Sequence, residues 1–331
     1  MAIPAASSSY CPSSPATFAA ATWARPRRGR SLCQVAAGGR HGPTPVNWRE
    51  TALQPRPAAV DRRRCDCFDL HQQIVPFAES QAWQESIVAR RKGLAGRGED
   101  HSDTLIALQH PPVFTLGNGT TEECLHFDKE NPPCDVHRVD RAGKATYHGP
   151  GQLVMYPILN LCYHGKYLDL YQRSLEEVII RALHSAFSIK ASRVDGLTGV
   201  WVGDQKVASI GIHVVFPRYI TCQGVALNVT TDLSPFEMIV PCGIKGCCMG
   251  SIKEILQKAS DGRGIDETSL MDQAYNSLIK EFAEVFKLSL DHSPNWSLQQ
   301  SNDFNKLNSV LLDFCRSQKS VQVDSRDKNY L

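Results

Sequence analysis

The chain has 331 residues, 42% of them hydrophobic, which is enough to bury the core of one large domain. Its longest apolar stretches, residues 153–161 and 207–216, are far shorter than the ~20 residues of a membrane-spanning helix, so no such helix is expected. The formal net charge of +2 hides ten arginines against two acidic residues in positions 1–64, and the acidic remainder argues against a general nucleic-acid or anionic-membrane binder.

The first 64 residues have the composition of an organelle transit peptide. They are rich in Ala, Ser, Pro and Arg and contain no acidic residue before Glu50. Serines and prolines near the start interrupt the apolar run of about 7–15 residues that a secretory signal needs. The serine-rich start, with its first arginine at position 25, favours a plastid, and hence the stroma, over a mitochondrion. A basic tail without a targeting role is the alternative.

Twelve cysteines are spread through the chain, two of them, Cys11 and Cys33, inside this leader. Because the leader is not secretory, reduced thiols are expected rather than a disulfide framework. The clusters at 65–67 and 242–248 lack the paired spacing of a structural zinc site, so no metal is expected.

In chain order, the segment after the leader alternates strands with a helix. Strands are predicted at 67–75 and 105–108, and the helix between them, at 77–91, is expected to end at Gly93 and Gly96. The prolines at 111–112 then break the chain, because proline lacks a backbone donor and disfavours helix in the residue before it. Further strands are predicted at 135–139 and 153–161, joined by a glycine-rich loop.

The second half contains two amphipathic helices. Apolar residues at helical spacing predict them at 167–187 and 267–286. Between them, a hairpin of 200–202 and 207–216 and a strand at 219–229 are expected. The polar tail, assigned to 291–331, has apolar spacing compatible with one terminal helix near 304–314. This order predicts an α+β fold, with a mixed or antiparallel β-sheet flanked by helices, for residues 65–290.

Residues 141–153 form a glycine-rich loop with polar side chains. Three glycines and a proline let the backbone turn sharply and approach a ligand, while Thr146, His148 and Gln152 present polar groups. By itself this pattern fits either a ligand-binding loop or a tight structural turn capped by the histidine.

Two later segments each carry one reactive side chain in an unusual place. Lys206 shares a strand face with Ala208 and Ile210, where a charge needs a partner or a position at the mouth of the hairpin. A lysine that snorkels at an edge is the alternative. Cys242 stands between a proline and a glycine, on a constrained turn where a thiol can be exposed. A buried, inert cysteine is the alternative.

Together the three segments resemble the lipoyl(octanoyl) transferase family, in its plant plastidial form. The family's loop reads approximately R-G-G-x-x-T-[aromatic]-H-x-P-G-Q-[aliphatic], followed by a K-[aliphatic]-A-S-[aliphatic]-G strand and a P-C-G turn. This chain has all three in that order, and similarity at 109–117 and 224–229 extends the resemblance from about residue 68 to residue 252. The resemblance implies the fold of biotin and lipoate protein ligases.

The resemblance also implies roles for individual residues. Cys242 would be the acyl-accepting nucleophile and Lys206 its partner. The walls of the acyl pocket would be Arg141, Ala142, Gly143, Lys144, Ala145, Thr146, Tyr147, His148, Ser209, Ile210, Gly211, Gly224, Val225 and Ala226. Ala142 departs from the family's glycine, and would be strained if the position needs a positive φ. Cys247 and Cys248 add thiols near the site.

The implied reaction moves an octanoyl group from an acyl-carrier protein to Cys242, and from there to a lysine of a lipoyl domain. The acceptors would be E2 subunits of 2-oxoacid dehydrogenases and the glycine cleavage H protein, with a monomeric enzyme and no cofactor. A free thiol has a pKa of about 8.5, so the Lys206 ammonium would favour the thiolate, and neutral Lys206 would later act as general base. Backbone N–H groups at 209–211 and at Gly243 would bind the oxyanion.

Three rival functions are separable from this one. An ATP-dependent lipoate or biotin ligase would carry a longer glycine run and would not need Cys242. A cysteine hydrolase would use His148 as base and release free acid to water. An acyl-binding or carrier-binding module without catalysis would tolerate the loss of Cys242.

Overall fold

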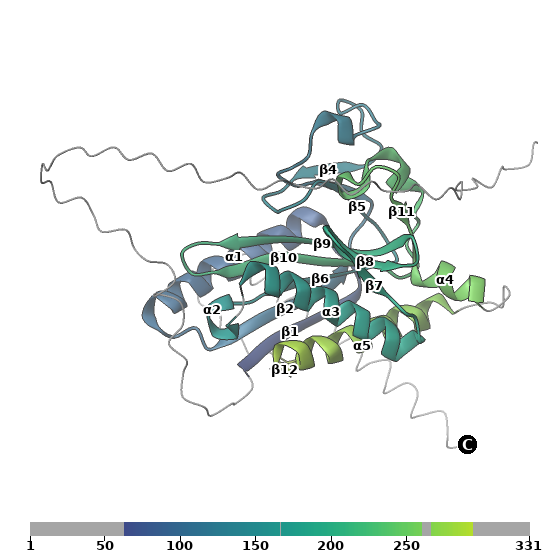
Figure 1. Ribbon diagram of the computed structural model, residues 1–331. Helices are drawn as coiled ribbons and strands as arrows, with labels where there is room; N and C mark the ends of the chain where they lie inside the picture. The colour runs from purple at the N-terminus through teal and green to yellow at the C-terminus, as the bar shows by residue number, and fades with distance from the viewer. Residues whose placement is uncertain (1–62, 166, 260–265, 294–331) are drawn as a thin grey trace, which may run out of the picture. The chain divides into compact units, whose positions relative to one another are not determined.

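A large mixed β-sheet forms the centre of the computed structural model, which describes residues 63–165, 167–259 and 266–293 (Figure 1). Its strand order is β12-β1-β2-β6-β10-β9-β8-β7, with β11 paired to β9. The strands are β1 (Arg63–Ile74), β2 (Ser102–Gln109), β6 (Gln152–Ile158), β7 (Ser192–Val194), β8 (Leu197–Val202), β9 (Gln205–Val215), β10 (Ile220–Asn228), β11 (Cys248–Met249) and β12 (Leu288–Asp291). β1 runs parallel to β2 and β12, whereas the pairs from β2 to β7 are antiparallel. The predicted mixed sheet is confirmed.

Helices cover both faces of this sheet. They are α1 (Phe77–Arg97), α2 (Leu161–His164), α3 (Leu168–Phe187), α4 (Ile252–Ala259) and α5 (Glu267–Phe286). α3 and α5 pack against each other on one face, where Leu175 and Phe282 belong to the largest apolar cluster. α1 packs on the other face through Trp83 and Ile87. The apolar stripes of α3 and α5 explain why both helices were predictable almost to the residue.

A second, three-stranded sheet has the order β4-β3-β5. It consists of β3 (Val113–Leu116), β4 (Asp135–Arg138) and β5 (Ala145–His148), and the short 3₁₀ turns of this region are η1 (Glu122–Cys124), η2 (Ser234–Met238) and η3 (Pro241–Gly243). The sequence patterns missed β3 and treated β5 as part of a loop. Each strand has only four residues, which is too short to show a period. The two strands also pair across about thirty residues of sequence, so no local pattern predicts their pairing.

The end of α1 differs from the prediction. The helix passes through Gly93 and Gly96 and ends at Gly98, which has φ 75° and donates its N–H to the carbonyl of Ala95. A glycine inside a helix costs only about 1 kcal/mol, which the buried face of α1 offsets. The left-handed conformation at Gly98, which glycine adopts easily, sets the terminus.

Two predicted features lie outside the described residues. They are the transit peptide, except for its last two residues, and the terminal helix near 304–314. Asp291, the first residue that the sequence assigned to the polar tail, instead belongs to β12, because this strand extends the sheet beside β1.

Candidate active site

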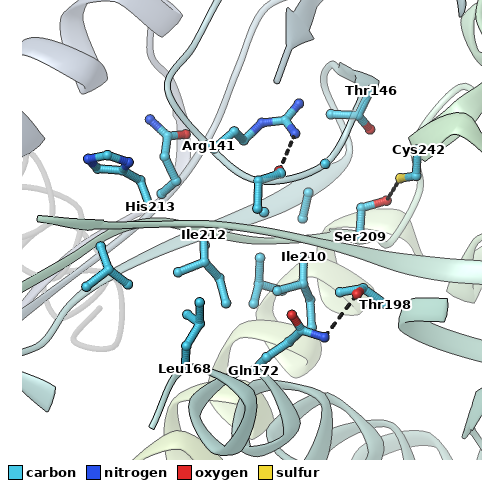
Figure 2. Close-up of a pocket in the computed structure, with 18 of the residues that line it drawn as sticks. Arg141, Thr146, Leu168, Gln172, Thr198, Ser209, Ile210, Ile212, His213 and Cys242 are labelled. Atoms are coloured by element: carbon cyan, nitrogen blue, oxygen red, sulfur yellow. Dashed lines mark hydrogen bonds between the residues drawn. The ribbon is translucent and has the colours of Figure 1, made fainter. Parts of the chain in front are cut away.

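A cavity of about 670 Å³ brings most of the predicted site residues together (Figure 2). It is lined by β5, β6, β9 and β10, by the loop at residues 141–144 and by Cys242. Figure 2 shows Ser209 and Cys242 on one side of β9, and Leu168, Gln172 and Thr198 on the other. The cavity therefore reaches both faces of the strand.

Two of the fourteen predicted wall residues do not line the cavity. Ala145 and Tyr147 point into the apolar cluster of the small sheet, whereas Thr146 and His148 line the cavity. The reason is the strand geometry of β5, in which successive side chains face opposite sides. The run 141–148 therefore lines this cavity at every position except these two.

Paired glycines keep one part of the cavity wall free of side chains. Gly211 of β9 stands opposite Gly224 of β10. A Cβ at Gly211 would lie 2.8 Å from Cδ of Arg141, and one at Gly224 would lie 2.2 Å from the carbonyl oxygen of Met155. Any side chain at these two positions would therefore disturb the loop or the neighbouring strand.

Cys242 sits on a turn with a left-handed backbone. Its φ is 54° and its ψ is 13°, and Gly243 follows with φ 74°. A positive φ is uncommon in residues other than glycine and is often found at functional sites. The half-buried thiol lies 3.6 Å from the hydroxyl oxygen of Ser209. The predicted constrained turn is present, and the thiol is neither buried nor remote from the cavity.

The backbone N–H of Gly243 is not free to bind an oxyanion. It donates to the carbonyl oxygen of Val240 at 2.9 Å as part of the turn. The prediction that this N–H binds the oxyanion was wrong, because the turn that carries Cys242 uses the N–H of Gly243 in its own hydrogen bond.

Lys206 is 1% exposed, which rules out a lysine that snorkels at an edge. Its ammonium lies 5.1 Å from the centre of the Trp201 ring, and among the described residues no carboxylate forms an ion pair with it. Burial raises the pKa of Cys247, the charge of Lys206 lowers it, and the charge of Cys242 raises it. Lys206 and Cys242 thus share one electrostatic neighbourhood.

Arg141 places a second cation within electrostatic reach of the thiol. Its guanidinium donates to the carbonyl and hydroxyl oxygens of Thr115, at 3.0 and 2.8 Å. Burial lowers the pKa of Arg141, and the negative charge of Cys242 opposes that shift. The sequence assigned Arg141 only to the pocket wall, and nothing in its motif indicated this proximity.

The loop that carries Arg141 is docked on β9 without strain at Ala142. The N–H of Ala142 donates to the carbonyl oxygen of Ile212 at 2.9 Å. Among the described residues the positive φ of this loop falls on Gly143, at 92°, and not on Ala142. The alanine that departs from the family pattern is therefore accommodated.

His148 is held inside a hydrogen-bonded chain. Its Nδ1–H donates to Oε1 of Gln152 at 2.7 Å, and its Nε2 accepts from the hydroxyl of Thr115 at 3.2 Å. Gln152 in turn donates to Asn228 at 2.9 Å, and Asn228 donates to the carbonyl oxygen of Gly250. Burial lowers the pKa of His148 to about 3. This neutral ring has both nitrogens occupied and is unsuited to act as a base.

These hydrogen bonds also connect the loop of Arg141 with the strand of Lys206. The series begins at Arg141, which donates to Thr115, and it ends where the N–H of Gly250 donates to the carbonyl oxygen of Lys206 at 3.0 Å. The hydrogen bonds of Thr115 and Asn228 were not predicted, although both residues lie in segments that match the family. No local pattern shows that these distant segments meet.

One buried polar atom of the cavity has no partner. Thr146 is 5% exposed and lines the cavity, and its hydroxyl forms no hydrogen bond within the described part of the chain. Figure 2 shows this hydroxyl directed toward the side of the cavity that holds Cys242 and Ser209. Buried polar groups are nearly always paired, so this donor is available to a ligand.

The described residues show neither a metal site nor a membrane span. No cluster of three or more His, Cys, Asp or Glu in residues 63–165, 167–259 and 266–293 is arranged to hold a metal ion. None of the helices in these ranges is both long and apolar enough to cross a membrane.

The chain is similar to proteins of known family. Residues 76–283 match the lipoyl protein ligase A/B catalytic domain. The chain is 50% identical over 237 residues to octanoyltransferase LIP2p2, chloroplastic, of Arabidopsis thaliana, covering 72% of this chain and 84% of that protein. It is 42% identical over 225 residues to an octanoyltransferase of Nostoc sp., covering 68% and 94%.

Solved structures show the same fold at low sequence identity. Lipoate-protein ligase A bound with ATP superposes with a TM-score of 0.54 at 16% identity, covering 76% of this chain and 94% of that one. A putative lipoate protein ligase from T. acidophilum gives 0.51 at 15%, covering 76% and 95%. The predicted ligase-like fold and the predicted family are both confirmed. The chain belongs to the lipoyl protein ligase A/B catalytic domain family and, within it, to the octanoyltransferases.

Proposed function

We propose that this protein transfers an octanoyl group from an acyl-carrier protein to a lysine of a lipoyl domain through a thioester on Cys242. The observation that carries the proposal is the placement of this thiol: it lies on a left-handed turn beside the cavity, next to Ser209, with the cations Lys206 and Arg141 in electrostatic reach. The octanoyl group itself follows from the names of the relatives.

In the first half-reaction, the Cys242 thiolate attacks the carbonyl carbon of the carrier's thioester. The new C–S bond forms, the bond to the carrier's pantetheine sulfur breaks, and the Lys206 ammonium gives its proton to the departing thiolate. One thioester replaces another, so the step needs no ATP. Lys206 is left neutral by this proton transfer.

In the second half-reaction, the lysine amine of the lipoyl domain attacks the acyl-enzyme. The C–N bond forms, neutral Lys206 accepts the amine proton, and the Cys242 thiolate leaves. This restores the ammonium–thiolate pair of the resting enzyme. The acyl chain lies in the cavity, where burial contributes about 0.8 kcal/mol for each methylene removed from water.

The geometry disfavours the hydrolase alternative. A hydrolase using Cys242 would need His148 as base, but this ring is neutral, buried and hydrogen-bonded through both nitrogens. Among the described residues, the one other histidine that lines the cavity is His213, which sits near Asp140 at the end of β9 away from Cys242 (Figure 2). Transfer to an amine through Lys206 therefore fits the site better than transfer to water.

Intact-mass measurement after mixing the protein with octanoyl-carrier protein tests the proposal. The expected result is an added octanoyl group that is removed by hydroxylamine and that passes to an added lipoyl domain. An ATP-dependent ligase would acylate the lipoyl domain only from free acid and ATP. A hydrolase would release free octanoate at the same rate with and without the lipoyl domain.

The hydroxyl of Thr146 is proposed as the donor to the acyl carbonyl oxygen, in place of the occupied N–H of Gly243. Thr146→Val keeps the shape but removes the donor, and kcat should fall by roughly 10²–10³-fold with little change in KM. The melting temperature should not fall, because no hydrogen bond within the protein is lost.

Thr231→Val is the matched control for this prediction. Thr231 is also 5% exposed with an unpaired hydroxyl in the described structure, but it does not line the cavity. Its replacement should leave kcat unchanged. A Thr146→Val enzyme with kcat within threefold of wild type would eliminate the hydroxyl as the oxyanion donor.

The proposed acceptors are lipoyl domains of 2-oxoacid dehydrogenase E2 subunits and the glycine cleavage H protein, and the proposed compartment is the plastid stroma. The acceptors are supported by a structure of the same fold, that of an archaeal bi-partite lipoate protein ligase and its E2 lipoyl domain. The compartment is supported by the Arabidopsis relative, which is named chloroplastic. Import of the full chain into isolated chloroplasts checks the compartment; uptake by mitochondria alone would refute it.

A further inference from the structure

We propose that Glu176 and Gly199 are positioning residues that hold the Lys206 ammonium in place. Lys206 is among the largest fully buried side chains, yet no carboxylate of the described residues pairs with it. A long, flexible side chain without an ionic partner needs some other constraint to keep its amine in one position. The inference rests on the proposed role of Lys206 in proton transfer.

The first constraint is steric and comes from Gly199 of β8. This glycine has φ 125°, and a Cβ there would lie 2.6 Å from Cε and 3.2 Å from Nζ of Lys206. The same Cβ would lie 2.5 Å from the carbonyl oxygen of Ala208. The lysine side chain therefore passes directly over the Cα of Gly199, with the Trp201 ring as a further neighbour of the ammonium.

The second constraint comes from α3, which holds this part of β8 through two side chains one turn apart. Gln172 donates through Nε2 to the hydroxyl of Thr198 at 2.9 Å (Figure 2). Glu176 accepts from the N–H of Gly199 at 3.2 Å through Oε1. Both contacts come from the same face of α3 because residues four apart in a helix are neighbours.

The carboxylate of Glu176 acts through its hydrogen bond with the N–H of Gly199 and not as a counter-charge for Lys206. Glu176 is 0% exposed, and its Oε2 accepts from Arg173 at 2.9 Å and from Arg193 at 3.0 Å. These two arginines neutralise the carboxylate, which leaves Oε1 for the N–H of Gly199. Glu176 thereby fixes the segment of backbone over which Lys206 lies.

The test compares Glu176→Ala, Glu176→Gln and Glu177→Gln in the full enzyme. Octanoyl-enzyme is formed on each variant, and its transfer to the lipoyl domain is followed against pH. Glu177 pairs with Arg181 and Arg193, whereas the N–H of Gly199 donates to Glu176, so Glu177→Gln is the matched control.

The expected results separate positioning from a general loss of structure. Glu176→Ala should slow transfer about 10²-fold and change its pH dependence, because a displacement of about 1 Å is enough for such a loss. Glu176→Gln, whose amide oxygen can still accept from Gly199, should recover most of the rate, and Glu177→Gln should match wild type. Wild-type transfer and pH dependence in folded Glu176→Ala would overturn the proposal, as would equal losses in all three variants.

Gly199→Ala keeps the proposal testable if Glu176→Ala fails to fold. Its control is Gly203→Ala, since Gly203 also has a positive φ, 61°, but open space where its Cβ would lie. Only Gly199→Ala should slow transfer; equal rates in the two variants would refute the proposal. If wild type itself forms no octanoyl-enzyme, the proposed function fails instead, and this outcome is distinguishable from all of the others.

Discussion

Cys242→Ser is expected to lower turnover by several orders of magnitude and to leave no thioester in the intact-mass spectrum. The thiolate is the nucleophile in acyl exchange, and a serine hydroxyl has almost no anionic character at neutral pH. The substitution changes little else, because the side chain is half-buried and its hydrogen-bond neighbour Ser209 can pair equally well with a hydroxyl. Pre-steady-state acylation with octanoyl-carrier protein is the measurement.

Cys247→Ser and Cys248→Ser are the controls for this result. Both cysteines follow the same turn and are partly buried, and Cys247 shares the electrostatic neighbourhood of Lys206. Burial raises the pKa of Cys247, which makes it a poor nucleophile near neutral pH. Both variants should stay largely active. If one of them were inactive while Cys242→Ser turned over, the nucleophile would be misassigned.

Lys206→Ala is expected to slow both half-reactions, with a loss of about 10²–10⁴-fold in transfer to the lipoyl lysine. The larger loss falls on transfer because the amine proton then has no acceptor. The loss of the ammonium also removes a positive charge near the thiol, so alkylation of Cys242 at neutral pH should slow. Arg141 remains as a second cation within electrostatic reach of Cys242, so alkylation should slow without stopping. The rate of alkylation against pH and single-turnover transfer measure the two effects separately.

Lys206→Arg distinguishes the charge of the lysine from its ability to carry a proton. Arginine keeps the positive charge but cannot give up its proton under these conditions. The variant should therefore retain alkylation of Cys242 and fail at transfer, provided that the larger group fits beside Gly199 and Trp201. Normal transfer in Lys206→Ala would show that the buried lysine is structural and that the base is another group.

The fold could be predicted where the information is local. The apolar residues of α3 and α5 recur at helical spacing within one segment, and the hairpin of β8 and β9 is marked by a short turn and by alternating side chains. The small sheet could not be predicted in this way. β3 and β5 pair across a long stretch of chain, and neither has enough residues to show a period of its own.

The sequence by itself determined the family, the nucleophile candidate Cys242 and the lysine candidate Lys206. Each motif consists of residues close together in the sequence, and the order of the motifs can be read directly from it. Only the tertiary structure decided the state of these groups. The burial of Lys206 depends on its contact with Gly199, and the occupied nitrogens of His148 depend in part on Gln152. The position of Arg141 depends on its hydrogen bonds with Thr115. Burial, hydrogen bonding and electrostatic shifts are properties of three-dimensional neighbours, and in this protein many of those neighbours come from distant segments of the chain.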